Sequence, residues 1–343
     1  MGIIYSKLEG TRDPLYGKFE KPIKAIIQDE ANHREEDKTI LKALYNVEKS
    51  HRFAETVMSE VGFDSFKYKG EGERAANLNA ELGYKKTIEH IPFAGEFTIT
   101  REMADDAQFG LGADLKRIPR AFVGSYYDTQ VEIASWALYN GTNTGGKFNG
   151  STVDLTTCDG LPLFHKAHTF TNAKGTQANR FYSSTAISAS NIEKLLNILA
   201  NRVRNFKDEK GKTMNYVADT IVVPCNRPEL EMLIKKVCGS EGEVGSAFNA
   251  INTQYGNWTF VTLPGWETTD DKFMVMSSKA NKNLMGNAFY NRVDLDIQNE
   301  VDIHTRNNIW NGYSRFGIGF NTWKHIALFE TAQTSSVAEA ITL

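Results

Sequence analysis

The chain has 343 residues, 41% of them hydrophobic and 24% charged, and a formal net charge of −3. This length and composition predict a folded protein with either two compact units or one large domain with insertions. The near-neutral charge argues against tight binding to nucleic acid, three scattered cysteines argue against a disulfide framework, and the absence of about 18 consecutive apolar residues argues against a membrane span.

The first part of the chain predicts an extended arm followed by a helix. Residues 1–31 show no clear periodicity and contain two glycines and two prolines at separate positions, Gly10, Pro14, Gly17 and Pro22. This pattern is typical of an extended arm. From about Asn32 to Val61, apolar residues recur on one side of a helix. These residues are Ile40, Leu44, Val47 and Val57.

Residues 62–97 predict a long hairpin with a loose tip. Glycines separate the runs FDSFKYK and YKKTIEHI, in which apolar and polar residues alternate as in strands. The tip between them, KGEGER, is too polar and too rich in glycine to bury enough surface to order itself. We therefore expect the tip either to be free or to rest on another surface.

Two helices should follow the hairpin. Thr100 can cap a short helix whose first turns carry Glu102, Asp105 and Asp106. A longer helix is expected from about Leu115 to Asn140, ended by Gly141 in a left-handed conformation, with Pro119 tolerated in its first turn. It would be roughly 35–40 Å long. Its apolar stripe comprises Phe122, Tyr126, Thr129, Ile133 and Trp136.

The sequence after residue 141 predicts both helices and strands, separated by loops. Residues 142–185 should be rich in loops, and residues 240–256 should form a surface loop. A helix from Ser190 to Phe206 should begin with a capping box of Ser190 and Glu193, and a second helix should run from Pro228 to Gly239. Strands are expected at DTIVVP (Asp219 to Pro224), WTFVTLPGW, FMVMS, VDLDIQNEVDIHT, YSRFGIGF and HIALFE. Because no regular βαβ alternation appears, the predicted class is α+β.

The most enzyme-like group is Cys158-Asp159-Gly160 with His165 and His168. Zinc sites use these residue types, but a His-x-x-His spacing in a loop differs from the metalloprotease arrangement, which places two histidines at i and i+4 on a helix. A polar loop that contains two histidines is the simpler interpretation. We therefore assign no catalytic, cofactor-binding or metal residues, and we expect no cofactor. A metal-dependent hydrolase that uses Asp159, His165 and His168 remains an alternative.

Other signs of chemistry are absent from the sequence. It contains no G-x-S-x-G elbow, no phosphate loop and no Rossmann fingerprint. Four tryptophans are not interleaved with lysine or arginine, which favours core or subunit contacts over base stacking. These are Trp258, Trp266, Trp310 and Trp323. An arm and a projecting hairpin would expose unpaired edges in a monomer, so they indicate a subunit of an assembly.

Two segments resemble the major head subunits of Mu-like tailed phages, which have the Hong Kong 97-type capsid fold. The segment FTITREMADDAQFG (Phe97 to Gly110) has the family's Arg, Asp-Asp and Gly after the hairpin, and CDGLPLFHKAH (Cys158 to His168) has its Asp-Gly, aromatic and His. Gly175 and Asn179 also fit. The resemblance covers roughly Gly62 to Phe329.

The resemblance implies a division of the chain into the parts of a capsid subunit. Residues 1–61 would be the N-terminal arm and helix, and residues 62–97 the E-loop that reaches across a neighbour. Residues 98–185 would form a peripheral domain with the long spine helix, and residues 186–298 an axial domain. Residues 299–343 would add the return strands of the peripheral domain and the C-terminus.

The implied function is that of a major capsid protein without enzymatic activity, which forms pentamers and hexamers of an icosahedral phage head around double-stranded DNA. Implied partners are a separate scaffolding protein, a portal protein at one vertex, a possible decoration protein and DNA contacted non-specifically, with no membrane. The protein would be found in the virion after assembly in the bacterial cytoplasm. Lys67, Lys69, Lys85 and Lys86 lie in or near the E-loop, but we predict no cross-links. An encapsulin-like nanocompartment shell, which has the same fold, is the nearest alternative.

Overall fold

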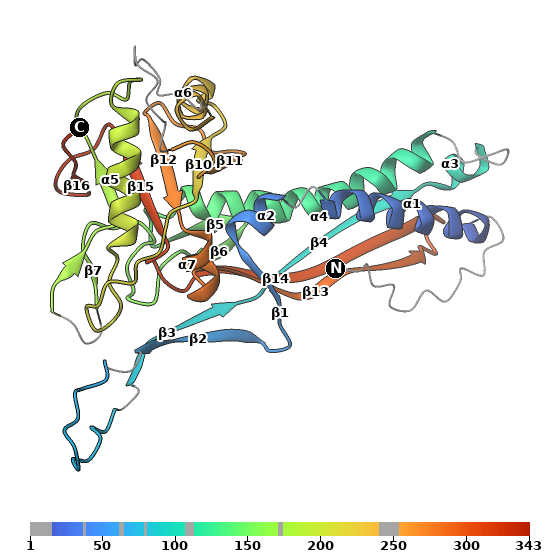
Figure 1. Cartoon of the computed structure of the whole chain (residues 1–343). Coiled ribbons are helices and arrows are strands. Elements are labelled where there is room, and N and C mark those ends of the chain that lie inside the picture. The colour runs from blue at the N-terminus through green and yellow to red at the C-terminus, as the bar shows by residue number, and fades with distance from the viewer. Residues whose placement is uncertain are drawn as a thin grey trace.

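The computed structural model shows an elongated lobe, a compact lobe and a projecting hairpin (Figure 1). Helices and strands are mixed along the chain, so the predicted α+β class is confirmed. Within the ranges described, no helix combines the length and the apolar character needed to cross a membrane. The structure describes residues 16–36, 39–61, 65–78, 81–106, 113–170, 174–239 and 254–343.

The elongated lobe is a four-stranded sheet with two helices that lie side by side along it (Figure 1). The strand order is β1–β13–β14–β4, with β1 parallel to β13 and the other pairs antiparallel. The strands are β1 (Asn46–Lys49), β13 (Asn287–Val301), β14 (Asn308–Phe320) and β4 (Ile91–Ile99), and the helices are α1 (Tyr16–Glu36) and α4 (Ala113–Tyr139).

Aromatic side chains join the long helix to this sheet. Trp310 of β14 stacks on Phe97 of β4 with ring centroids 5.8 Å apart, and Phe97 contacts Phe122 of α4 at 5.0 Å. At Gly312 of β14, a Cβ atom would lie only 2.6 Å from the Phe122 ring. Glycine at this position therefore lets the helix approach the sheet closely.

The compact lobe is a six-stranded sheet of order β11–β10–β12–β15–β9–β16. Its helix α5 buries Ile192, Leu195, Leu199 and Val203 of the stripe that the sequence predicted, and the fifth member, Phe206, is buried just beyond the end of the helix. The strands are β9 (Arg180–Tyr182), β10 (Thr220–Pro224), β11 (Thr259–Leu263), β12 (Lys272–Met276), β15 (Ile326–Glu330) and β16 (Glu339–Ala340), and the helices are α5 (Ile192–Arg204) and α6 (Pro228–Gly239).

Helix α4 belongs to the cores of both lobes. Its first half contributes Leu115, Val123 and Tyr127 to the core of the elongated lobe, whereas Ile133 and the residues after it enter the core of the compact lobe. The connections are completed by α2 (Thr39–Leu44), α3 (Arg101–Asp106), α7 (Ser278–Asn283), β5 (Gly145–Phe148), β6 (Ser151–Asp154), β7 (His168–Thr169) and β8 (Thr176–Gln177).

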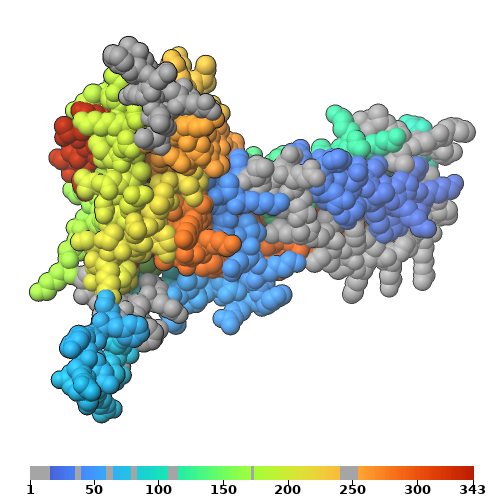
Figure 2. Space-filling model, in the orientation of Figure 1, coloured from blue at the N-terminus to red at the C-terminus, as the bar shows by residue number. Residues whose placement is uncertain are grey.

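The hairpin consists of β2 (Ala54–Val61) and β3 (Glu81–Glu89), which pair antiparallel with each other. Its tip projects far from both lobes (Figure 2). The described tip residues, 65–78, form no strand and are almost all exposed. The predicted hairpin is thus present, but its first strand precedes the FDSFKYK run. The described part of that run, residues 65–69, forms no strand, so the predicted strand is wrong there.

The predictions for the N-terminal region are wrong where the structure describes it, and residues 1–15 of the expected arm lie outside the described residues. Residues Tyr16–Glu36 form α1, not an extended arm, and they bury an apolar stripe with spacings of three and four. The helix expected from Asn32 to Val61 is not continuous, because the chain after α2 enters β1 and β2. Val47 and Val57, which the helical periodicity included, lie on those strands.

Two predicted helix ends differ in detail. Gly141 does not adopt the left-handed conformation; a Cβ atom there would lie 3.0 Å from both the Leu138 carbonyl and the Phe164 ring, so close packing requires glycine. Helix α5 has Asn191 as its N-cap residue, and no side chain caps it, so the Ser190–Glu193 capping box is wrong. Most of the predicted loop at 240–256 lies outside the described residues.

Candidate functional site

The structure brings Asp159 and His168, two of the three candidate metal ligands, into direct contact. The Nδ1 atom of His168 lies 2.8 Å from Oδ2 of Asp159, and both side chains are buried. The other ring nitrogen, Nε2, lies 3.1 Å from Oδ1 of Asn179. On its face, the imidazole stacks on the Trp323 indole with ring centroids 4.5 Å apart.

The hydrogen bonds of Asn179 fix the orientation of its side chain toward His168. The amide Nδ2 of Asn179 donates to the carbonyls of Leu163 at 2.7 Å and Ile326 at 3.2 Å, while its Oδ1 accepts the N–H of His165 at 2.9 Å. The His168 ring therefore lies between two acceptors, the Asp159 carboxylate and the Asn179 amide oxygen.

Asp159 is held in its charged form. Burial alone would raise the pKa of this carboxyl, but the hydrogen bond and positive charge of His168, together with hydrogen bonds from Thr157 and Leu161, lower the pKa. The Thr157 hydroxyl donates to Asp159 Oδ1 at 2.5 Å, and the Leu161 N–H donates to it at 3.3 Å. Both carboxylate oxygens are thus occupied by donors from the protein.

The remaining candidates do not complete a metal site. The Nδ1 atom of His165 accepts the N–H of Ala167 at 3.2 Å, and burial is the main cause that lowers the pKa of His165. Burial also raises the pKa of the Cys158 thiol to about 12, so it is an unreactive thiol. Among the residues described, no group of three His, Cys, Asp or Glu side chains could hold a metal ion. The Asp159–His168–Asn179 network therefore has the chemistry of a structural tie between a loop and β15.

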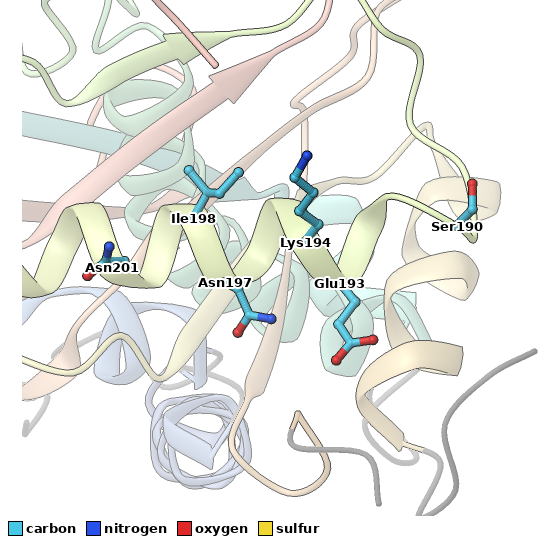
Figure 3. Close-up of a pocket in the computed structure, with 6 residues that line it drawn as sticks. All are labelled: Ser190, Glu193, Lys194, Asn197, Ile198 and Asn201. Carbon is cyan, nitrogen blue, oxygen red and sulfur yellow. The ribbon is translucent and has the colours of Figure 1, made fainter. Parts of the chain in front are cut away.

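The groove along α5 offers no convergent chemistry either. It has a volume of about 490 Å³, and all its lining residues lie on α5 or directly before it. Figure 3 shows Lys194 and Ile198 projecting to one side of the helix and Glu193 and Asn197 to the other. Side chains that diverge in this way do not form a catalytic arrangement.

The base of the hairpin carries a second polar network, which the sequence did not indicate. Ser50 follows β1 and His90 precedes β4, so they mark the two points where the chain passes between body and hairpin. The Ser50 hydroxyl donates to Oε1 of Glu55 at 2.7 Å, and Nε2 of His90 lies 2.8 Å from the same hydroxyl oxygen. Arg292 donates to the Ser50 carbonyl and Arg315 to the His90 carbonyl. These contacts join the two chain segments that connect the body to the hairpin.

Lys86 attaches strand β3 of the hairpin to β6, a few residues before His90 in the chain. Its side chain is 8% exposed, and Nζ donates to Oδ2 of Asp154 at 2.5 Å and to the Thr156 hydroxyl at 2.7 Å. Burial would raise the pKa of Asp154, but its hydrogen bonds with Lys86 and Thr156 lower it. No sequence signal distinguished Lys86 from the neighbouring Lys85, because the role depends on the position of β6.

The tip of the hairpin, in contrast, has little support from its own chain. Phe66 is 95% exposed and Tyr68 is 96% exposed, although both are large hydrophobic side chains. Lys67 and Lys69 alternate with them in sequence. An exposed aromatic pair on a projection of this kind is typical of a surface that another molecule covers.

The comparisons with known proteins bear on the fold. No family model matches the chain, and no curated protein matches its sequence. Among solved structures, the capsid of cyanophage P-SCSP1u matches with a TM-score of 0.52 at 12% identity, over 86% of this chain and 89% of that one. The capsid of an empty GTA particle matches with a TM-score of 0.51 at 12% identity, over 85% of this chain and 90% of that one. A structure of Mycobacterium phage Patience matches with a TM-score of 0.50 at 13% identity, over 98% of this chain and 94% of that one.

Identities this low establish the fold and not the family. The chain has the fold of phage capsid proteins, as the resemblance implied, and the match extends over most of its length.

Proposed function

We propose that the protein is a major capsid protein, a structural subunit that self-assembles into pentamers and hexamers of an icosahedral phage head enclosing double-stranded DNA. Two independent features support this proposal. The fold is shared with phage capsid proteins, and the chain projects a hairpin that its own body does not cover.

The observation that carries the proposal is the exposed tip. Phe66 and Tyr68 are both more than nine-tenths exposed. Covering large aromatic side chains stabilises an assembly by roughly 1.5–3 kcal/mol for each. Head-to-tail contacts that close into rings repeat this gain in every subunit, so a modest contact yields a durable shell.

We assign the parts of the subunit as follows, with boundaries adjusted to the elements. The hairpin from Ala54 to Glu89 acts as the E-loop, and α4 acts as the spine helix. The elongated lobe acts as the peripheral domain, and the compact lobe acts as the axial domain. The residues before β1 then form the N-terminal region, of which α1 packs beside the spine helix.

We further propose a role without enzymatic activity, in the virion, after assembly in the host cytoplasm. The closed Asp159–His168–Asn179 network supports this role because its polar atoms bond one another. Proposed partners are a separate scaffolding protein, a portal protein at one vertex, a possible decoration protein and non-specifically contacted DNA.

The test is sedimentation velocity combined with negative-stain electron microscopy of the purified protein, with and without the scaffolding protein of the same virus. We expect closed shells of uniform size. A chain that stays monomeric at high concentration under all these conditions would refute the proposal. Shells that never package DNA and lack a portal in infected cells would instead indicate a nanocompartment.

A further inference from the structure

The chain enters the hairpin after β1 and returns from it between β3 and β4 (Figure 1). Ser50 directly follows β1, and His90 is the single residue between β3 and β4. Both side chains are buried, and the contact between Nε2 of His90 and the Ser50 hydroxyl joins the two segments. A titratable side chain therefore lies at the point where the hairpin leaves the body.

The surroundings of the His90 ring favour its neutral form. The Ser50 hydroxyl donates its one proton to Oε1 of Glu55, so its oxygen accepts from Nε2 of His90 at 2.8 Å. The other ring nitrogen, Nδ1, lies against the backbone of β14, where a Cβ atom at Gly317 would be 2.8 Å from it. Among the described residues, Nδ1 has no hydrogen-bond partner. An imidazolium ring would carry a second, buried N–H there without an acceptor, which is costly.

Two cations and one anion surround the ring. Arg292 of β13 donates to the Ser50 carbonyl, and Arg315 of β14 donates to the His90 carbonyl. Burial is the main cause that lowers the pKa of His90, and the charge of Arg315 lowers it further. The charge of Glu55 on β2 raises this pKa, and that of Arg292 lowers it. A positive charge on the ring is therefore disfavoured by both burial and its neighbours.

The other titratable groups around His90 do not change this balance. The Tyr290 ring of β13 packs edge-on against the imidazole, with ring centroids 6.3 Å apart. Lys86, Glu89 and Asp154 line the same cavity as His90, which has a volume of about 400 Å³. Lys86 and Asp154 bond each other there. None of these groups supplies an acceptor for Nδ1.

We propose that His90 is a proton-sensitive latch at the base of the hairpin. Near neutral pH, the uncharged ring joins the two segments and sets the direction of the hairpin. Below the ordinary histidine pKa of about 6.5, the ring binds a proton more readily once it has left its site, so acid favours an open base. The contribution of the latch is thus complete above about pH 6.5 and is lost as the pH falls below it. This inference goes beyond the capsid role and requires only the folded chain.

A first test measures amide hydrogen exchange of the full-length protein by mass spectrometry at pH 7.5 and 5.5, with rates corrected for the intrinsic effect of pH. Peptides that cover residues 50–57 and 86–90 should exchange about fivefold faster at pH 5.5, because the base opens more often. His90→Gln, whose amide can donate to Ser50 and does not titrate, should reduce this ratio to less than about twofold. His51→Gln is the matched control, because it removes an exposed histidine beside Ser50 and should keep the ratio.

A second test changes the charges beside the ring and leaves His90 in place. Arg315→Gln removes a neighbouring cation, so the ratio of the two exchange rates should fall to about twofold. Glu55→Gln removes the neighbouring anion while its amide oxygen can still accept from Ser50, so the ratio should rise toward about tenfold, the limit for one proton over one pH unit. A purely structural role of His90 would not produce these opposite changes, and they decide the question even if His90→Gln does not fold.

Three results would overturn the latch. They are equal corrected exchange at both pH values, a pH dependence that survives His90→Gln, and the same change of the ratio in Arg315→Gln and Glu55→Gln. Each of them would leave the capsid role intact, because none depends on whether the chain forms shells.

Discussion

At the scale of single residues, two buried histidines have different surroundings. His168 lies between a carboxylate and an amide oxygen, whereas burial lowers the pKa of His325 and favours its neutral form. Nε2 of His325 lies 2.7 Å from Oδ1 of Asn287, whose Nδ2 donates to the Leu44 carbonyl. Nδ1 of His325 lies so close to Gly286 that a Cβ atom there would be 2.4 Å away.

The first prediction concerns pH. Burial lowers the pKa of His325 to about 3, below its unfolded value of about 6.5. The folded state therefore takes up this proton less readily, and stability falls as pH drops below about 6.5, by up to about 1.4 kcal/mol per pH unit. His325→Gln, which keeps a donor for Asn287 and does not titrate, should reduce this slope. Urea unfolding of both proteins between pH 7 and 4.5 measures how the free energy of unfolding changes with pH. Equal slopes in the two proteins would contradict a lowered pKa of His325.

The second prediction concerns the buried ion pair. Asp159→Asn would remove the buried carboxylate that accepts hydrogen bonds from Thr157 and Leu161 and contacts His168, and leaving buried polar groups without their partner costs about 1–3 kcal/mol, or more where a charged group is involved. The matched control is Asp105→Asn, because Asp105 forms an exposed pair with Arg101 and should cost less than about 1 kcal/mol. Chemical denaturation gives both values. Similar free energies of unfolding for the two variants would show that the network does not stabilise the fold.

At the scale of elements, the hairpin combines a fixed base with an uncovered end. A contact between Ser50 and His90 joins the two chain segments at its base, and Lys86 attaches β3 to Asp154. Its strands pair with each other as far as Val61 and Glu81. The base can therefore set the direction of the hairpin, while the tip remains available to another molecule.

The third prediction tests this division. Replacing residues 62–80 with Asn-Gly should give a tight turn, because Val61 and Glu81 are already cross-strand partners and Asn-Gly favours a two-residue hairpin loop. The shortened subunit should keep its unfolding temperature but form no closed shells, as judged by calorimetry and electron microscopy. Normal shells from it would mean that the tip has no part in assembly.

Elements whose signal lies within one short segment of the chain were predictable from sequence. The buried stripe of α5, the span of α4 and the core strand β10 follow from local periodicity. Strand β1 could not be predicted in this way, because only its parallel partner β13, more than two hundred residues later in the chain, makes it a strand. Strand β2 carries mostly polar or half-buried residues and pairs only within the hairpin, so it has no clear alternation.

The candidate site was predictable only in part. The spacing of Asp159, His165 and His168 drew attention to a polar cluster, but its role depends on Asn179 and Trp323, which the fold brings to it. Neither the Ser50–His90 contact nor the Lys86–Asp154 contact has a local sequence pattern. Both form because β1, β3 and β6 come together around the base of the hairpin.

At the scale of the whole molecule, helix α4 and the strands β13 and β14 join the two lobes, while the hairpin leaves the body. Because α4 enters both hydrophobic cores, the lobes should unfold as one unit. The exposed aromatic tip lies far from the elongated lobe of the same chain (Figure 1). It would be covered in an assembly of identical copies.

The most direct measurement is an electron cryomicroscopy reconstruction of assembled particles at a resolution that shows side chains. The account predicts icosahedral shells in which the hairpin of each subunit leaves its own body and Phe66 and Tyr68 are buried against a neighbouring copy. A particle in which the hairpin folds back on its own subunit, with both aromatic side chains buried there, would contradict it.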